Sequence, residues 1–375
     1  MKSVEKLTID AIAYGGEAVG RLASGAVCFV RGALPGEEAE VEITEAKKRF
    51  ARGKVLSLLT ASPHRIAPAC PYAAACPGCA FQHCTYELEI EWKQKQFERF
   101  LKKFPGERMA FFAAPERFFQ RNRLKLACEN GKAGYRGFDN KTLVPIDRCL
   151  LVRQEINNAL QKTVLPDEGT LFFRSTPSWS GEVSDLQTGF LTDTIPDAGT
   201  FKVPARGFFK TNIAVAAELC ARVVQTIREF SAKNILELFC GVGVFSIAAA
   251  LKIPELQCHG IELADTSIET AKMNAASYGL ENRCTFHAGD AADYPKGKYD
   301  LLLLDPPRNG LEKKLVQKIL KSNIPVLIYI SCGPDTLQRD LELLAERYTV
   351  LRAGALDMFP CTAHFETFTI LTLSK

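Results

Sequence analysis

Three short motifs in the second half of the chain carry residues that could do chemistry. The first is S-C-G-P at residues 331–334, in which Cys332 follows the apolar run 324–330. A strand that delivers a cysteine at its carboxyl end, just before a Gly-Pro turn, puts a thiol where an open α/β sheet keeps its reactive groups. The others are D-P-P-R at 305–308 and the glycine turn C-G-V-G at 240–243. Together they predict a nucleophilic thiol beside a nucleotide-type pocket.

The glycine turn belongs to a strand-turn-helix pattern that is typical of nucleotide-binding sheets. The apolar strand 235–239 runs into Gly241 and Gly243, and a later strand ends in Glu262. An acid at that place accepts hydrogen bonds from ribose hydroxyls. A dinucleotide site would have a third glycine where Ser246 stands, so the helix N-terminus is less suited to a pyrophosphate. The pattern favours S-adenosylmethionine over NAD.

A further acid, Asp290, comes after the next predicted strand, residues 284–287. From there its carboxylate could reach the adenine side of the cofactor. The alternative is that Asp290 is the N-cap of a helix, a position that aspartate often takes. The sequence leaves both interpretations open.

Three closely spaced cysteines lie in the Pro-, Ala- and Cys-rich stretch 61–90. The spacing C-x5-C-x2-C groups Cys70, Cys76 and Cys79. A metal site of this kind needs a fourth thiolate. The candidates for it are Cys84, Cys128 and Cys149. Zinc usually takes two short cysteine pairs, whereas three clustered thiolates and a distant one are typical of an iron–sulfur cluster, so the spacing favours iron–sulfur over zinc and over unliganded thiols.

The pattern around these motifs predicts the elements that position them. Residues 4–58 read as short alternating strands between glycine turns, which predicts a small barrel, either purely structural or of the RNA-binding OB type. A helix is predicted over 87–103, and alternating strands such as 123–127 follow. From residue 205, strands alternate with helices as in a doubly wound α/β sheet.

Prolines and small-residue turns make residues 192–204 a plausible domain boundary. We therefore expect a barrel at 1–60, a central domain at 61–204 and an α/β domain at 205–375. A chain of 375 residues is long enough for two or three domains.

Composition and charge narrow the functional class. The net charge is +4, but residues 91–153 hold 15 Lys and Arg against 7 Asp and Glu, which gives +8 for that stretch. Basic residues mixed with aromatics suit a nucleic-acid surface, although a solvated basic face over an aromatic core is the equal alternative. No apolar run approaches the roughly 20 residues of a membrane span, and the chain start lacks a signal-peptide core. The expectation is a cytoplasmic protein without a membrane partner, in which the thirteen cysteines do not form a disulfide framework.

These motifs, together with H-x-E at 364–366, resemble those of the RNA uracil-5-methyltransferase family that carries a TRAM domain and a [4Fe–4S] cluster. The resemblance extends over the whole chain. It implies an α/β fold: a Rossmann-like S-adenosylmethionine-dependent methyltransferase domain, an N-terminal OB-type barrel (TRAM), and an α+β central domain with the iron–sulfur cluster. The family pattern V-x-I-x-x-C maps onto residues 144–149, so the resemblance makes Cys149 the fourth cluster ligand beside Cys70, Cys76 and Cys79.

The resemblance also implies roles for site residues. The thiolate of Cys332 would add to uracil C6, C5 would take the methyl group, and Glu366 would remove the C5 proton. Asp305 would lie by the cofactor or the uracil edge. The residues implied to bind the cofactor are Lys210, Phe239, Gly241, Gly243, Glu262, Asp290 and Asp305. The substrate would be RNA, with ribosomal RNA favoured over transfer RNA, and the enzyme a monomer.

Two positions depart from the family pattern. Lys210 stands where the family has a glutamine that touches the cofactor, and lysine adds a charge and cannot accept a hydrogen bond. Gly333 replaces an asparagine next to the nucleophile. They motivate one rival, an RNA-binding or folding factor that has lost efficient catalysis. The other rival is an amino-methyltransferase, which would need an aromatic residue where Arg308 follows the prolines.

Overall fold

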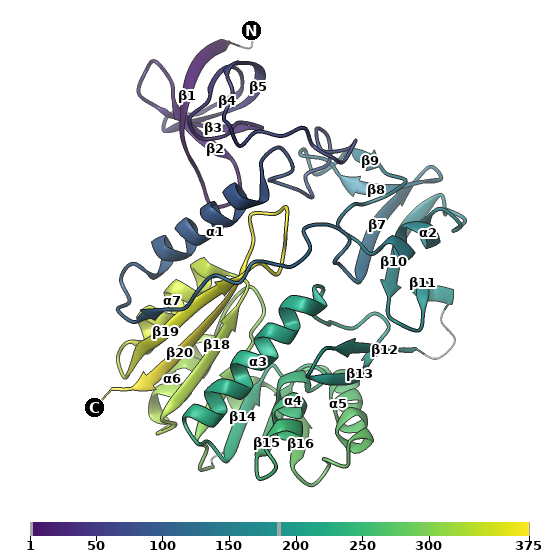
Figure 1. Ribbon diagram of the computed structural model, residues 1–375, viewed down its shortest axis with the longest axis vertical. Coiled ribbons are helices and arrows are strands. Elements are labelled where there is room, and N and C mark those ends of the chain that lie inside the picture. The colour runs from purple at the N-terminus through teal and green to yellow at the C-terminus, as the bar shows by residue number, and fades with distance from the viewer. Residues whose placement is uncertain (1–2, 186–188, 296, 375) are drawn as a thin grey trace. The chain divides into compact units, whose positions relative to one another are not determined.

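A computed structural model describes residues 3–185, 189–295 and 297–374 (Figure 1). The chain divides into two compact units. The first comprises Met1–Gln96, Tyr135–Val144 and Cys361–His364. The second comprises Phe97–Gly134, Pro145–Pro360 and Phe365–Lys375. The predicted three-domain boundaries therefore stay a prediction.

The first unit begins with a closed barrel in the strand order β1-β2-β3-β5-β4. Its strands are β1 (Val4–Ile12), β2 (Ala18–Arg21), β3 (Val27–Arg31), β4 (Glu38–Ala46) and β5 (Phe50–Thr60). Alternate residues such as Leu7, Ile9 and Val41 point inward and are buried. Because a strand turns successive side chains to opposite faces, this alternation closes a core inside the barrel and confirms the predicted small barrel.

The loop after the barrel is tied down by Glu37. Its carboxylate accepts hydrogen bonds from Leu34 N (2.7 Å) and Ser62 N (3.1 Å) and pairs with Arg65 Nε at 2.5 Å. Helix α1 (Tyr86–Leu101) follows, close to the predicted helix over 87–103.

The second unit is built on a sheet of eight strands in the order β16-β15-β14-β17-β18-β20-β19-β6. The first five strands of that order pair in parallel, β20 pairs antiparallel with both β18 and β19, and β6 pairs in parallel with β19. Their bounds are β6 Glu107–Arg108, β14 Asn234–Leu238, β15 Gln257–Glu262, β16 Cys284–Ala288, β17 Leu301–Leu304, β18 Val326–Ser331, β19 Tyr348–Leu356 and β20 Glu366–Leu373.

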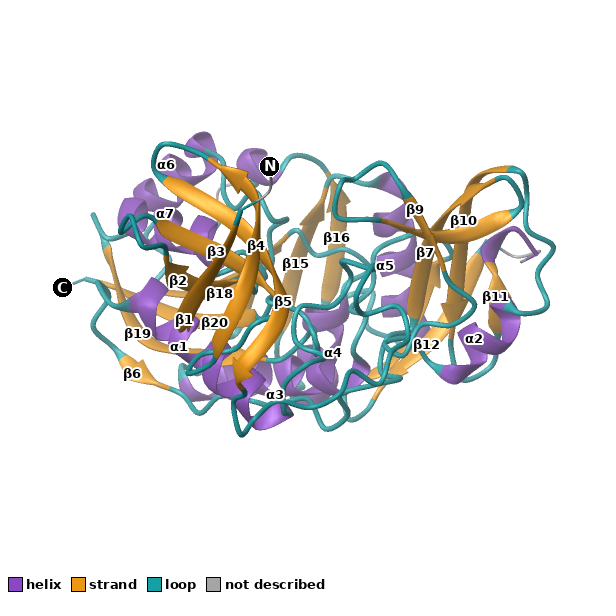
Figure 2. Ribbon diagram, turned by 90° about the horizontal axis from the view of Figure 1, so that it is seen from above, coloured by secondary structure: helices purple, strands orange, loops and turns teal. Residues whose placement is uncertain are grey.

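Helices cover both faces of this sheet (Figures 1 and 2). Leu301 and Leu303 of β17 pack in one core with helices α3, α4 and α5, whereas Leu302 and Leu304, which point the other way, are equally buried but lie outside that core. The helices are α3 Ile213–Glu229, α4 Val244–Lys252, α5 Asp265–Ser277, α6 Lys313–Lys321 and α7 Pro334–Leu344, with 3-10 turns at Val183–Asp185 and Ala291–Asp293. Because both faces are buried, the central strands β17 and β18 are almost entirely apolar, and the predicted doubly wound α/β fold is confirmed.

The remaining elements include a small antiparallel sheet in which β10 pairs with β7 and β11, and β7 pairs with β8. The bounds here are β7 Arg123–Glu129, β8 Lys132–Arg136, β9 Leu143–Pro145, α2 Gln154–Leu160, β10 Glu168–Ser175, β11 Ser180–Glu182, β12 Phe190–Ile195 and β13 Gly199–Pro204.

Residues 192–204, the predicted domain boundary, lie in the hairpin of β12 and β13. Strands β12 and β13 pair antiparallel, and Ile195, Phe201 and Val203 join the core of the eight-stranded sheet. Asn274 of α5 holds the hairpin through bonds to the backbone N and O of Lys202, at 2.7 and 3.0 Å. The prolines that suggested a boundary lie at the hairpin ends, where a strand tolerates the missing N–H.

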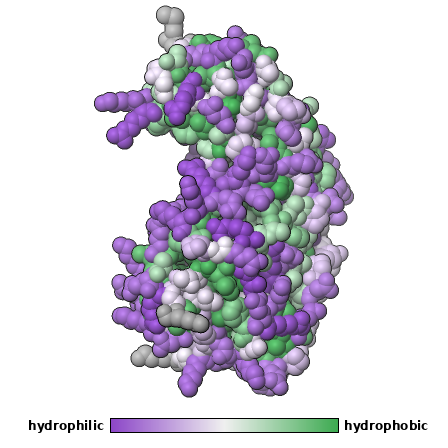
Figure 3. Space-filling model, turned by 60° about the vertical axis from the view of Figure 1, so that its left-hand side comes forward, coloured by the Kyte–Doolittle hydropathy of each residue, from purple (hydrophilic) through white to green (hydrophobic). Residues whose placement is uncertain are grey.

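On the face drawn in Figure 3, hydrophilic side chains predominate and apolar ones appear as scattered groups. In the part of the chain that the structure describes, no helix has the length and apolar character needed to cross a membrane.

Candidate active site

The site lies where the parallel strands of the eight-stranded sheet end. Asp305 follows β17 and Cys332 follows β18. Strand β20 runs antiparallel to β18 with Thr367 opposite Ser331, so its first residue, Glu366, lies at the same edge. The fold thus brings the predicted nucleophile, the predicted base and the D-P-P-R loop to one end of the sheet, as expected for an open α/β fold.

Lys210 joins these groups from the segment between β13 and α3. Its Nζ lies 3.0 Å from a carboxylate oxygen of Asp305 and 3.0 Å from Glu366 Oε1. The Glu366 side chain is 2% exposed and that of Lys210 is 11% exposed. Nζ also lies 5.8 Å from the ring centre of Phe208, which is exposed. One ammonium therefore pairs with two carboxylates in a largely buried place, and the three groups together carry a charge of −1.

This environment sets the protonation of the site. Burial lowers the pKa of Lys210, but Asp305 and Glu366 raise it above its ordinary value, so the lysine stays charged. Burial raises the pKa of Glu366, and Lys210 opposes that rise. Burial and Glu366 also raise the pKa of the Cys332 thiol, while Lys210 and Arg308 lower it. The thiol and the base are thus affected by the same two cations, Lys210 and Arg308.

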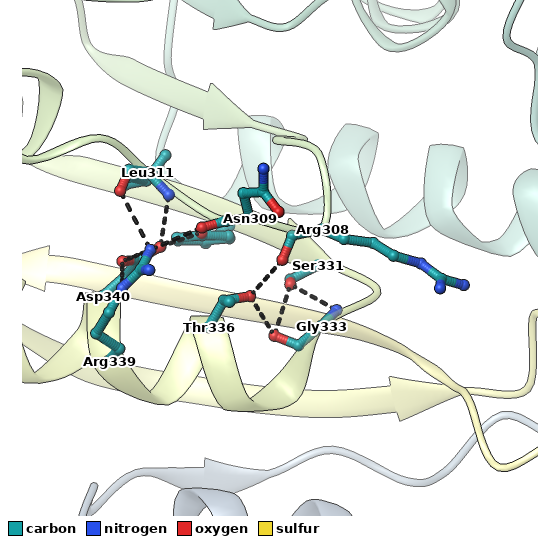
Figure 4. Close-up of polar contacts among 9 residues, drawn as sticks. Arg308, Asn309, Leu311, Ser331, Gly333, Thr336, Arg339 and Asp340 are labelled. Atoms are coloured by element: carbon teal, nitrogen blue, oxygen red, sulfur yellow. Dashed lines mark hydrogen bonds and ion pairs between the residues drawn. The ribbon is translucent and has the colours of Figure 1, made fainter. Parts of the chain in front are cut away.

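A hydrogen-bond network fixes the D-P-P-R loop against the nucleophile turn (Figure 4). The Thr336 hydroxyl lies within donating distance of two carbonyl oxygens, Arg308 O at 3.0 Å and Gly333 O at 2.9 Å. Buried Asp340 accepts from Leu311 N and from the Tyr329 hydroxyl, both at 2.7 Å. These hydrogen bonds link the loop after β17 to the turn after β18 and the start of α7.

Gly333, the second departure from the family pattern, is explained by Thr336. The φ of Gly333 is −122°, which any residue can adopt. A Cβ at this position would lie 2.7 Å from Thr336 Oγ1 and 3.1 Å from Arg308 O. The hydroxyl that clamps the two loops thus occupies the space that a larger side chain at 333 would need.

We expect Gly333→Asn alone to lower the free energy of unfolding by about 1–3 kcal/mol, because it overpacks this turn. The double variant Gly333→Asn with Thr336→Ala should recover part of that loss. Denaturant unfolding of the wild type, both single variants and the double variant measures the coupling. Additive effects of the two substitutions would contradict the proposed collision.

The glycine turn after β14 has the open backbone of a ligand cradle. Gly241 and Gly243 have φ of +53° and +81°, and nothing lies within 4 Å of a Cβ built on Gly241. Phe239 also has a positive φ, +64°, which is a strained conformation for a residue with a side chain. Glu262 at the end of β15 accepts from Gly241 N at 3.2 Å, and Leu263 beside it is 75% exposed. The space beside Gly241 is therefore open, whereas that beside Gly243 is filled by Phe286.

Asp290 caps a turn, as the alternative interpretation expected. Its Oδ1 accepts from Ala292 N at 2.7 Å at the start of the 3-10 turn Ala291–Asp293.

Two groups of polar residues were missed by the sequence reasoning. Buried Glu237 of β14 accepts from Ser246 N at 3.0 Å and from the Ser246 hydroxyl, and burial raises the pKa of Glu237 to about 8. Ser246, read above only as a missing glycine, therefore anchors the start of α4 to the sheet. An acid inside an apolar strand is the signal that could have revealed this pair.

The second group lies along the backbone that carries Lys210. Among the described residues, both amide atoms of Gln120, together with Asn122 Oδ1, Thr211 Oγ1 and Asn212 Nδ2, are buried without a hydrogen-bond partner. Asn122 Nδ2 donates to Lys210 O at 3.2 Å, and Asn122 N donates to Thr211 O at 3.1 Å. Buried polar groups normally have partners, so this unmet capacity is typical of a site that a ligand completes.

Exposure separates the thirteen cysteines into two groups. Eight are buried, among them Cys84 and Cys128, the alternative candidates for a fourth metal ligand. The five that are partly exposed are Cys70, Cys76, Cys79, Cys149 and Cys332. These are the four predicted cluster ligands and the predicted nucleophile.

Two of the cluster candidates accept hydrogen bonds at sulfur. Gly78 N donates to Cys76 Sγ at 3.4 Å, and Gln82 Nε2 donates to Cys79 Sγ at 3.3 Å. Such bonds suit thiolate sulfur, so the donor chemistry fits a metal cluster. Within residues 3–185, 189–295 and 297–374, however, no three His, Cys, Asp or Glu side chains converge as a metal site would.

Two family models match the beginning and the second half of the chain. A family model described as tRNA (Uracil-5-)-methyltransferase matches residues 185–374, and a TRAM domain model matches residues 3–56. An uncharacterized RNA methyltransferase of Bdellovibrio bacteriovorus is 30% identical over 99% of this chain and 95% of its own length. A 23S rRNA (uracil(1939)-C(5))-methyltransferase of a Marinomonas species is 28% identical over 99% of this chain and 96% of its own.

The fold is also found among solved structures. The tRNA (uracil-54, C5)-methyltransferase of Pyrococcus abyssi, solved with S-adenosyl-L-homocysteine, superposes with a TM-score of 0.77 and 24% identity. The match covers 99% of this chain and 100% of that one. At this identity the likeness is one of fold.

Proposed function

The chain belongs to the RNA uracil-5-methyltransferase family and is an S-adenosylmethionine-dependent enzyme of that class, and we propose that it methylates a uridine of 23S ribosomal RNA through Cys332 and Glu366. The observation that carries the proposal is the meeting of Cys332, Glu366 and Asp305 at one edge of the sheet, although they come from three strands. An amino-methyltransferase would need neither the thiol nor the buried acid.

Each residue has a chemical task in this reaction. Uracil C5 is a poor nucleophile until the Cys332 thiolate adds to C6 and makes the ring enolate-like. S-adenosylmethionine, when bound, supplies the methyl group. Glu366 then takes the proton from C5, so that the thiolate can leave and the ring regains its double bond. Because Cys332 and Glu366 lie at the end of the sheet, the target uracil must leave the stacked bases of the RNA to reach them.

The cofactor is held, in this proposal, at the glycine turn. The open space beside Gly241 lets the cofactor approach the protein backbone, and the Glu262 carboxylate accepts hydrogen bonds from the ribose hydroxyls. Phe239 and Gly243 follow the carboxyl end of β14 and Asp290 follows that of β16, which supports their place in this proposed site. Lys210 is expected from its position to touch the cofactor, and it also pairs with Asp305 and Glu366, so its role is argued separately below.

The substrate class is testable directly. The Marinomonas relative, which aligns over nearly the whole chain, supports 23S rRNA, while the fold neighbour acts on tRNA. Mass-spectrometric mapping of 5-methyluridine in cells with and without this protein should show one rRNA position losing its methyl group. Loss from tRNA alone would reassign the substrate. Loss nowhere, and no methyl transfer to any RNA in vitro, would favour the non-catalytic RNA-binding or folding factor.

We also propose that Cys70, Cys76, Cys79 and Cys149 hold a [4Fe–4S] cluster. The support is their spacing, their partial exposure among mostly buried cysteines, and the N–H···S bonds at Cys76 and Cys79. The cluster would be structural, since nothing in the reaction above needs an electron.

Protein purified without oxygen should therefore be brown and contain about four irons per chain. Cys70→Ser should lose most of this iron and lower the melting temperature. Cys128→Ala is the matched control: this cysteine is buried in β7, and its replacement should leave the iron content unchanged. A colourless wild type with one zinc per chain would contradict the assignment.

A further inference from the structure

Lys210 is a buried cation at a reaction centre whose other members are acidic. Its Nζ is 3.0 Å from both Asp305 and Glu366, and the three side chains are 11%, 15% and 2% exposed. A charge removed from water is tolerated only when it is closely paired. The ammonium is thus the group that makes two buried carboxylates possible here.

The charge balance shows why this matters for the reaction. Lys210, Asp305 and Glu366 sum to −1, and a thiolate at Cys332 would make the sum −2. Arg308 is the other cation with an electrostatic effect on Cys332, and it is exposed, so solvent weakens its influence. Lys210 is therefore the buried charge that offsets both the base and the nucleophile.

We propose that Lys210 is a positioning residue: it holds the Glu366 carboxylate against Asp305 in its ionised, proton-accepting form and lowers the electrostatic cost of the Cys332 thiolate. The assignment rests on the proposed function, because it acts through the nucleophile and the base of that reaction. A glutamine here could donate a hydrogen bond to one carboxylate but would bring no charge.

The groups that face Lys210 agree on the sign of its effect. They are Asp305 after β17, Cys332 after β18, Glu366 on β20 and Cys220 on α3. Arg308 is a second cation that acts on Cys332 and Glu366 in the same direction. Burial raises the pKa of Glu366 and of Cys332, and Lys210 lowers both. Without the ammonium both pKa values rise further, so thiolate and carboxylate would each form only at higher pH.

The first experiment follows Cys332 alone and needs neither RNA nor methyl transfer. Iodoacetamide is added over a range of pH, and alkylation of the peptide that contains Cys332 is measured by mass spectrometry for the wild type, Lys210→Met, Lys210→Gln and Lys210→Arg. At a pH below the thiol pKa, a rise of the thiol pKa by one unit lowers the thiolate fraction, and so the rate of alkylation, about tenfold. We expect Lys210→Met and Lys210→Gln to slow it about threefold to tenfold at pH 8, and Lys210→Arg to stay within about twofold of the wild type.

Lys210→Gln keeps the proposal testable if Lys210→Met does not fold, because the amide can still bond a carboxylate. It also separates charge from hydrogen bonding. Superimposable alkylation profiles of the wild type and Lys210→Gln, with equal melting temperatures, would overturn the proposal.

The second experiment measures methyl transfer to RNA against pH. The pH below which the rate falls should be higher in Lys210→Gln than in the wild type. In Lys210→Arg it should be the same as in the wild type. An unchanged pH in Lys210→Gln would overturn the part that concerns Glu366. A wild type that methylates no RNA would instead refute the proposed function, while the alkylation result would still decide whether Lys210 controls the thiol.

Discussion

Replacing Cys332 by alanine is expected to lower the rate of methyl transfer by at least about 10⁴-fold, because no other group can take the place of a covalent nucleophile. Cys332 is partly exposed at the end of β18, so its loss should change the melting temperature little. RNA with 5-fluorouridine at the target should become covalently attached to the wild type, since fluorine cannot leave C5 as a proton. The adduct should map to Cys332 by mass spectrometry and be absent from Cys332→Ala.

Cys240 and Cys361 provide matched controls. Both are buried, and burial raises the pKa of Cys240 well above its ordinary value, which makes it a poor nucleophile. Cys240→Ala and Cys361→Ala should still form the adduct. An adduct that maps to either of these cysteines would refute the assignment of the nucleophile.

Glu366→Gln is expected to lower the turnover rate by about 10²–10⁴-fold and to leave natural RNA attached to Cys332. Thiolate addition and methyl transfer precede the step that needs the base, so the methylated adduct should accumulate and decay slowly. The adduct is detected by denaturing gel electrophoresis after reaction with S-adenosylmethionine that carries a labelled methyl group. The double variant with Cys332→Ala should form none.

Glu262→Gln is the control that separates adduct accumulation in Glu366→Gln from a general loss of activity. Glu262 lies at the end of β15 by the glycine turn, so its replacement should raise the KM for S-adenosylmethionine without an accumulating adduct. Fast turnover of Glu366→Gln with no adduct would show that another group removes the proton. In the wild type the rate should fall as the pH drops, because the base must be ionised and burial raises the pKa of Glu366.

Features that depend on residues near one another in the chain could be predicted from the sequence. The glycine turn after β14, the acid at the end of β15, Asp305 after β17 and Cys332 after β18 all lie where apolar runs end in turn residues. Alternation in residues 4–58 predicted the barrel in the same way. A strand's length, faces and end are set by its own few residues, so local pattern was sufficient.

The charge arrangement of the site could be decided only by tertiary structure. Lys210 meets Asp305 across 95 residues and Glu366 across 156 residues of sequence. The meeting depends on β20 inserting antiparallel between β18 and β19, which turns Glu366 toward the edge where Cys332 lies. Local pattern shows that Lys210 departs from the family, but not which atoms its ammonium contacts. The partner of a buried charge is chosen by the desolvation that all the surrounding elements impose together, and this exists only once the sheet is assembled.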